Sequence, residues 1–129
     1  MRLVPIALAL SLTVVAQAFA AEGPLDYDKA YSDCLAEAGG ANNGTVSACA
    51  EDVANQTKPE MNRLYQAIRD RMNGTADAAK LEKAQKAWIV YRDNYCELAG
   101  SYVGSPMYYV CPMRLNVERV RQLREMAGE

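Results

Sequence analysis

The sequence predicts an all-α protein, a small antiparallel bundle of about four helices braced by two disulfides. Three observations lead to this prediction. Apolar residues recur at intervals of three and four, the period of a helix packed on one side, and no segment shows a convincing strand pattern. Segments rich in glycine and asparagine divide the chain into pieces of helix length. The four cysteines form two pairs with the same spacing.

The first twenty residues are expected to be a signal peptide and not part of the fold. Arg2 provides a positive start, residues 3–15 are mostly apolar, and small residues follow up to Ala20. The apolar stretch of about 13 residues is shorter than the roughly 20 that a membrane helix needs. We therefore expect cleavage after Ala20 and a secreted or periplasmic domain, residues 21–129, without a stable membrane span.

An even number of cysteines behind a secretion signal predicts two disulfides. Four cysteines allow three connectivities, and the sequence does not choose strictly among them. We favour the two local bridges, Cys34–Cys49 and Cys96–Cys111, because each would join the end of one helix to the start of the next. On the chain-entropy model each bridge contributes roughly 3 kcal/mol. Neither spacing is typical of a zinc site, and the chain has no histidine.

The first helix is predicted over about residues 26–38. Five residues at helical spacing would share its inner face: Tyr27, Ala30, Tyr31, Cys34 and Leu35. The glycine- and asparagine-rich residues 39–44 then end this helix. A second helix is predicted to begin after Thr45 or Ser47.

The second helix is predicted to kink or break at residues 57–60. Thr57 and Glu60 have the spacing of a capping box, and Pro59 suits the first turn of a new helix. Beyond this point five apolar residues follow one helical stripe: Met61, Leu64, Tyr65, Ile68 and Met72. Residues 73–75, Asn-Gly-Thr, end the segment and cap the next helix, which makes a tight helical hairpin.

A third helix is predicted over about residues 76–98, and a fourth from Met107 or Pro112 to Met126, with a loop at residues 100–106 between them. The third helix is expected to bury one apolar face: Leu81, Ala84, Trp88, Tyr91, Tyr95 and Leu98. The fourth helix is expected to bury another: Met113, Val117, Val120 and Leu123.

The charge balance argues against a nucleic-acid partner. The chain carries 14 basic and 16 acidic residues, a net charge of −2, whereas phosphate binding generally needs a basic surface. Acidic residues dominate residues 21–60, and basic residues dominate residues 61–129. An acidic end could steer a basic partner, although ordinary solvated helix faces explain the same pattern.

The chain offers no recognisable catalytic set. The absence of histidine removes Ser-His-Asp and Cys-His arrangements and the usual base at neutral pH. No phosphate loop, dinucleotide-binding glycine pattern or clustered metal-ligand motif is present in the sequence. We therefore predict that the protein is not an enzyme and that it binds no cofactor or metal.

Residues 84–96, Ala-Gln-x-Ala-Trp-x-x-Tyr-Arg-Asp-x-x-Cys, resemble a motif of the LprI-like lysozyme inhibitors, which are small secreted bacterial proteins. Residues 61–65 are similar to that family's Leu-Asn-x-x-Tyr, and residues 104–123 also match its pattern. The chain departs from the pattern at Met61, at Asn116, where threonine is frequent, and at Pro59, within a helix that is commonly continuous.

The resemblance implies a protein-binding module with lysozyme as its partner. Animal lysozymes are basic and carry two carboxylates in their cleft, so an acidic surface with an inserted donor group would suit them. The motif residues themselves are predicted to be structural: Asn62, Tyr65, Gln85, Trp88, Arg92 and Asp93. The alternative is a structural or stress-related periplasmic factor that has no inhibitory activity and an unknown partner.

Individual roles follow from the predicted helices. Arg92, four residues after Trp88, is expected to stack on the indole or to bond carbonyls at a helix end. A buried hydrogen bond is expected at Asn62 and Gln85, and an ion pair with a basic side chain at Asp93.

Three tyrosines are the candidates for contact with a partner: Tyr102, Tyr108 and Tyr109. They lie in or beside the predicted loop at residues 100–106, where aromatic residues often serve recognition.

Overall fold

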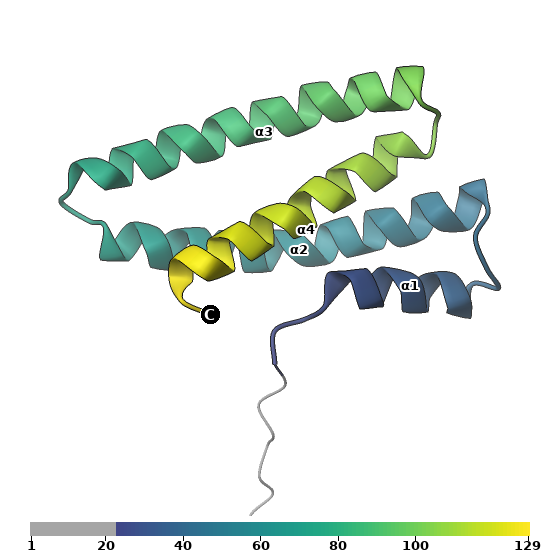
Figure 1. The fold of residues 1–129 in the computed structure, drawn as a ribbon, viewed down its shortest axis with the longest axis horizontal. Helices are drawn as coiled ribbons and strands as arrows, with labels where there is room; N and C mark the ends of the chain where they lie inside the picture. The colour runs from purple at the N-terminus through teal and green to yellow at the C-terminus, as the bar shows by residue number, and fades with distance from the viewer. Residues whose placement is uncertain (1–22) are drawn as a thin grey trace, which may run out of the picture.

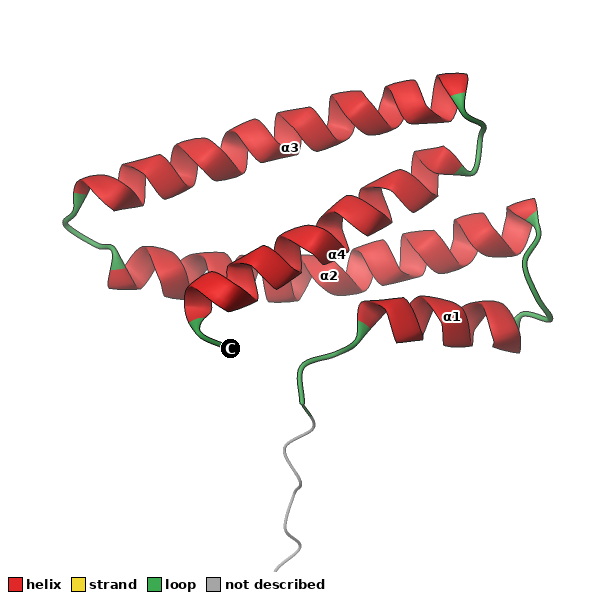
Figure 2. Cartoon of the chain, viewed as in Figure 1, coloured by secondary structure: helices red, strands yellow, loops and turns green. Residues whose placement is uncertain are grey.

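A computed structural model describes residues 23–129, so the expected signal peptide lies outside the described residues. The described chain forms four helices and no strand: α1 (Tyr27–Glu37), α2 (Asn43–Arg71), α3 (Ala76–Tyr102) and α4 (Met107–Ala127). Consecutive helices run antiparallel and are joined by short loops (Figures 1 and 2). The predicted all-α bundle is therefore confirmed.

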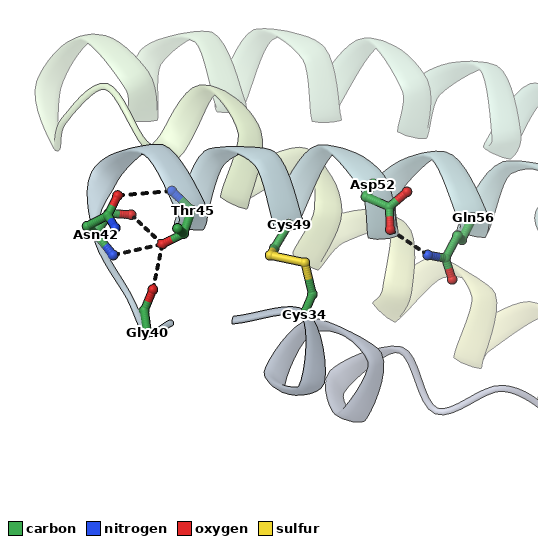
Figure 3. Close-up of a disulfide and its surroundings, with 7 residues drawn as sticks. All are labelled: Cys34, Gly40, Asn42, Thr45, Cys49, Asp52 and Gln56. Carbon is green, nitrogen blue, oxygen red and sulfur yellow. Dashed lines mark hydrogen bonds between the residues drawn. A yellow bond between two sulfur atoms is a disulfide. The ribbon is translucent and has the colours of Figure 1, made fainter. Parts of the chain in front are cut away.

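Helix α1 begins and ends with the capping chemistry that its sequence predicts. The side chain of Asp26 accepts hydrogen bonds from the backbone N–H groups of Asp28 and Lys29, both at 3.1 Å. Gly39 and Gly40 follow the helix with φ angles of 83° and 109°, in the region that favours glycine. The disulfide Cys34–Cys49 then ties α1 to α2 (Figure 3).

Helix α2 begins earlier than predicted and runs through Pro59 without a break. Asn42 and Thr45 form a reciprocal capping box at its start (Figure 3). The predicted break at residues 57–60 is wrong, and Thr57 caps no helix. Core residues lie on both sides of Pro59, among them Val53 and Leu64, and their burial favours one continuous helix.

Helix α3 continues one turn beyond the predicted end at Leu98. Its predicted inner face is correct only in its first half, where Leu81 is buried and Trp88 packs on the core. The other four predicted core residues are exposed: Ala84, Tyr91, Tyr95 and Leu98. The disulfide Cys96–Cys111 fixes Cys96 so that it faces α4. The side of α3 that carries Tyr91 and Tyr95 therefore faces solvent.

Helix α4 lies between α2 and α3 and contacts both, while α1 packs on α2. Its four predicted core residues are all buried: Met113, Val117, Val120 and Leu123. They meet residues of α2 such as Val53, Leu64 and Ile68 in one core cluster. The left-handed Gly128, with φ of 81°, ends the helix.

Both local disulfides that the sequence favours are present, Cys34–Cys49 and Cys96–Cys111. The α1–α2 and α3–α4 loops lie at the same end of the molecule (Figure 1), which we call the disulfide end. Within residues 23–129, no helix is both long and apolar enough to cross a membrane.

Candidate functional site

A groove of about 190 Å³ lies where α2, α3 and the start of α4 meet. Its lining combines two tyrosines with charged and amide side chains: Glu51, Ala54, Asn55, Lys58, Arg92, Asp93, Tyr108, Tyr109, Pro112 and Asn116. Three helices contribute to this surface, so its shape depends on how they pack together. We call it the tyrosine groove.

A hydrogen-bonded network underlies the tyrosine groove. Asn116 is 1% exposed; its amide donates to Thr57 Oγ1 at 3.1 Å, and its Oδ1 accepts from Arg92 Nη1 at 3.0 Å. Thr57 is also fully buried and donates its hydroxyl proton to the Ala54 carbonyl at 2.6 Å. These bonds satisfy polar groups that would be costly to bury alone.

Trp88 lies between two arginines beside this network. The guanidinium carbon of Arg92 is 5.1 Å from the ring centroid, and that of Arg119 is 5.7 Å from it. The predicted stacking of Arg92 on Trp88 is therefore present. Arg119 Nε also donates to Gln85 Oε1 at 2.9 Å, and burial lowers the pKa of its guanidinium.

The candidate tyrosines are divided between two surfaces. Tyr108 and Tyr109 line the tyrosine groove, whereas Tyr102, the last residue of α3, lies outside its lining. The ring of Tyr108 covers Gly100, where an added Cβ would come within 2.3 Å of that ring. Tyr108 and Ser101 also share a hydrogen bond of 3.1 Å between their hydroxyl groups. A side chain at position 100 would therefore displace Tyr108.

A comparison with protein families agrees with three features of the chain: its helical arrangement, its two disulfides and its motif at residues 84–96. The model of the family "Lysozyme inhibitor LprI" matches residues 34–123. The chain belongs to this family. It is also 35% identical over 98 residues to an uncharacterised protein of Rhizobium meliloti (strain 1021), covering 63% of this chain and 70% of that protein. No solved structure matches the chain.

The LprI motif residues fall into two groups in the structure. Gln85, Trp88 and Arg92 lie on the side of α3 that meets α4 and join the interior contacts described above. Asn62 is exposed and Tyr65 is half-buried, and both line a depression between α2 and α3 that Gln85 also lines.

Two expectations for individual motif residues have different outcomes. The buried hydrogen bond expected at Asn62 is wrong because Asn62 faces solvent. Gln85 does make partly buried hydrogen bonds between helices: it donates to Met61 Sδ at 3.6 Å and accepts from Arg119 Nε at 2.9 Å. The expected ion pair of Asp93 is present, at 2.7 Å from Arg92 Nη2.

Three important residues were not singled out for the roles they have here. Asn116 lies within the apolar stripe of the fourth helix, next to Val117, and a polar residue at such a position was a usable signal. Thr57 looked like a helix cap in the sequence. The need for glycine at position 100 arises only from the approach of Tyr108, which the local sequence does not encode.

A second polar cluster joins α1, α2 and α4 away from the tyrosine groove. Arg124 Nε donates to Glu60 Oε1 at 2.7 Å, and the Tyr27 hydroxyl donates to Glu60 Oε2 at 2.6 Å. Burial by itself raises the pKa of Glu60, but hydrogen bonds from Arg124 and Tyr27 outweigh it and hold this pKa below its usual value. Burial and the neighbouring Glu60 carboxylate raise the pKa of Tyr27.

The described residues contain no group of three or more histidine, cysteine, aspartate or glutamate side chains that could hold a metal ion. The tyrosine groove combines an aromatic pair and mixed charges with a hydrogen-bonded floor.

Proposed function

We propose that this protein is a secreted or periplasmic inhibitor that binds a basic lysozyme through its tyrosine groove and does not act as an enzyme. Membership of the LprI family carries the proposal. Two disulfides also suit an oxidising compartment outside the cytoplasm.

Charge supports the choice of this surface. Glu51 and Asp93 line the tyrosine groove together with Lys58 and Arg92, and Asp52 is exposed next to Glu51 in α2. Glu97 is exposed one turn beyond Asp93 on α3. Such a group of carboxylates would attract a basic enzyme and increase its rate of association.

The groove also offers donors for the two carboxylates of a lysozyme cleft. Lys58 is exposed and donates to Asn55 Oδ1 at 2.8 Å, so its ammonium group can exchange that partner for a carboxylate. Tyr109 is 43% exposed and carries a hydroxyl donor on a large apolar ring, a combination that is enriched at the centres of interfaces. We assign these two side chains to the direct contact.

Arg92 is not assigned to that contact. Its guanidinium is already held by Asn116, Asp93 and the Trp88 ring. Insertion into an enzyme cleft would break these contacts and leave the buried Asn116 short of a partner. The role proposed for Arg92 is to position the floor of the groove.

The test is a lysozyme activity assay on cell-wall substrate with increasing amounts of oxidised residues 21–129. We expect saturable inhibition by the wild type and at least roughly 30-fold weaker inhibition by Tyr109→Ala, since a central aromatic contributes about 2 kcal/mol or more. Met126→Ala is the matched control, because Met126 is 44% exposed on the same helix but at its other end.

The second candidate is a structural or stress-related envelope factor. The interior use of Gln85, Trp88 and Arg92 favours it, because these motif residues would then serve only the bundle. The decisive result would be a wild-type protein that is folded and helical but leaves animal-type lysozymes and lysozymes that act on bacterial targets fully active. That result would support this second candidate and rule out inhibition of those enzymes.

A further inference from the structure

Helix α3 carries an exposed stripe of large side chains that no other described element covers. Tyr91, Tyr95, Leu98 and Tyr102 are 54%, 49%, 57% and 86% exposed. Their spacing is four, three and four residues, which puts them on one side of the helix. The same spacing forms the seam between two helices in a coiled coil. We call these four residues the α3 stripe.

The α3 stripe is ordered and carries no charge. The rings of Tyr91 and Tyr95 stack on each other, with centroids 5.6 Å apart and planes 10° from parallel. Uncharged residues flank the stripe along one side: Ala87, Asn94 and Ser101. A second helix could therefore approach without meeting a like charge at the seam.

The spacing of the α3 stripe is the same in both directions. The spacings four, three and four read the same from either end of the stripe. Rotation of the helix by 180° about the midpoint between Tyr95 and Leu98 therefore places each stripe position on another stripe position. An antiparallel copy would set Tyr95 against Leu98 of the other copy and Tyr91 against its Tyr102. This is the self-complementary surface that a two-fold symmetric dimer requires.

The exposed area is of the size that a dimer needs. The four side chains present about 500 Å², if a fully exposed tyrosine or leucine presents roughly 200 Å². Two copies paired through these side chains would bury about 1,000 Å² in total, at the lower end of specific interfaces. A contiguous apolar patch of this size on a monomer marks an interaction site.

We propose that two copies of this protein pair through their α3 helices, antiparallel, about the midpoint of the α3 stripe. The uncharged, palindromic stripe favours a second copy over a basic protein, whose attraction would be to Glu51 and Asp93 in the tyrosine groove. The dimer does not depend on lysozyme binding, because Tyr109 and Lys58 are not part of the stripe.

Analytical ultracentrifugation of oxidised residues 21–129 over a range of concentrations tests the dimer. We expect a reversible dimer, and we expect Leu98→Glu to raise its dissociation constant by roughly 30-fold or more. Val90→Glu is the matched control, because Val90 is 60% exposed on the same helix but lies outside the stripe. Thermal unfolding followed by circular dichroism checks that both variants are folded.

Paired charges test the antiparallel register. Tyr91→Lys and Tyr102→Glu should each weaken the dimer, and the double variant should recover it, because the opposite charges would face each other across the two-fold axis. The two positions are about 16 Å apart along one helix, so they cannot pair within a single copy. A wild type that remains monomeric at all concentrations, or a double variant without recovery, would overturn the proposal.

Discussion

Asn116 joins three helices through one side chain. It belongs to α4, donates to Thr57 on α2 and accepts from Arg92 on α3. Because Asn116 and Thr57 are buried, neither can exchange these bonds for water. The tyrosine groove therefore rests on a network that loses several bonds when one residue is changed.

Replacement of this residue should be costly. Asn116→Ala removes one hydrogen-bond partner each from Thr57 and Arg92 and opens a small cavity, so we expect the free energy of unfolding to fall by about 3 kcal/mol. Urea denaturation monitored by circular dichroism measures this change. Asn94→Ala, at an exposed position, is the control and should remain within about 0.5 kcal/mol of the wild type. A loss below about 1 kcal/mol for Asn116→Ala would contradict this role.

Glu60 makes stability depend on pH in the acidic range. Its pKa is lower in the folded protein than in the unfolded chain, so its stabilising contribution is present at neutral pH and lost as the pH falls through the folded pKa. We expect Glu60→Gln to be less stable than the wild type by about 2 kcal/mol at pH 7. The difference should shrink as the pH falls through the folded pKa of Glu60. Chemical denaturation at each pH measures it, and a constant difference would show that protonation of Glu60 is irrelevant.

The local part of the site could be predicted from the sequence, and the contacts between helices could not. Arg92 lies four residues after Trp88 on one helix, so their stacking follows from helical geometry alone. The environment of Asn62 depends on how α2 is rotated against α3, and it was predicted incorrectly. The same dependence concealed the partners of Asn116 and the approach of Tyr108 to Gly100.

At the scale of elements, local signals located several helix ends, but the capping box expected at Thr57 and Glu60 is absent and α2 begins before its predicted start. Asp26, Gly39 and the residues 73–75 turn lie where helices were predicted to begin or end. Pro59 misled because proline weakens a helix locally, whereas burial on both sides of it decides whether the helix continues. The side of α3 that is buried was decided by the disulfide to α4, which periodicity alone does not reveal.

Helix α1 should depend on its disulfide. It has 11 residues, too few for a stable isolated helix. We expect the double variant Cys34→Ser, Cys49→Ser to lose roughly 3 kcal/mol and its α1 amides to exchange hydrogen much faster, while the amides of α4 stay protected. Hydrogen exchange followed by mass spectrometry resolves the two helices. Equal protection of α1 in the variant and the wild type would show that packing alone holds it.

At the scale of the whole molecule, recognition features gather toward the disulfide end. Tyr108 and Tyr109 follow the α3–α4 loop, and the exposed acids Glu51, Asp52 and Glu97 lie within three residues of a disulfide cysteine. The other end of α2 and α3 carries most of the lysines and arginines of those two helices. A basic lysozyme should therefore approach the disulfide end.

The inhibition constant of two matched charge-reversal variants tests this orientation most directly. Glu51→Lys with Asp52→Lys changes the disulfide end; Asp70→Lys with Glu125→Lys changes exposed positions elsewhere on α2 and α4 and alters the net charge by the same amount. We expect the first pair to weaken inhibition of a basic lysozyme about tenfold or more at low salt, and the second pair to have little effect. Equal weakening by both pairs, or no inhibition by the folded wild type, would contradict the proposed binding mode.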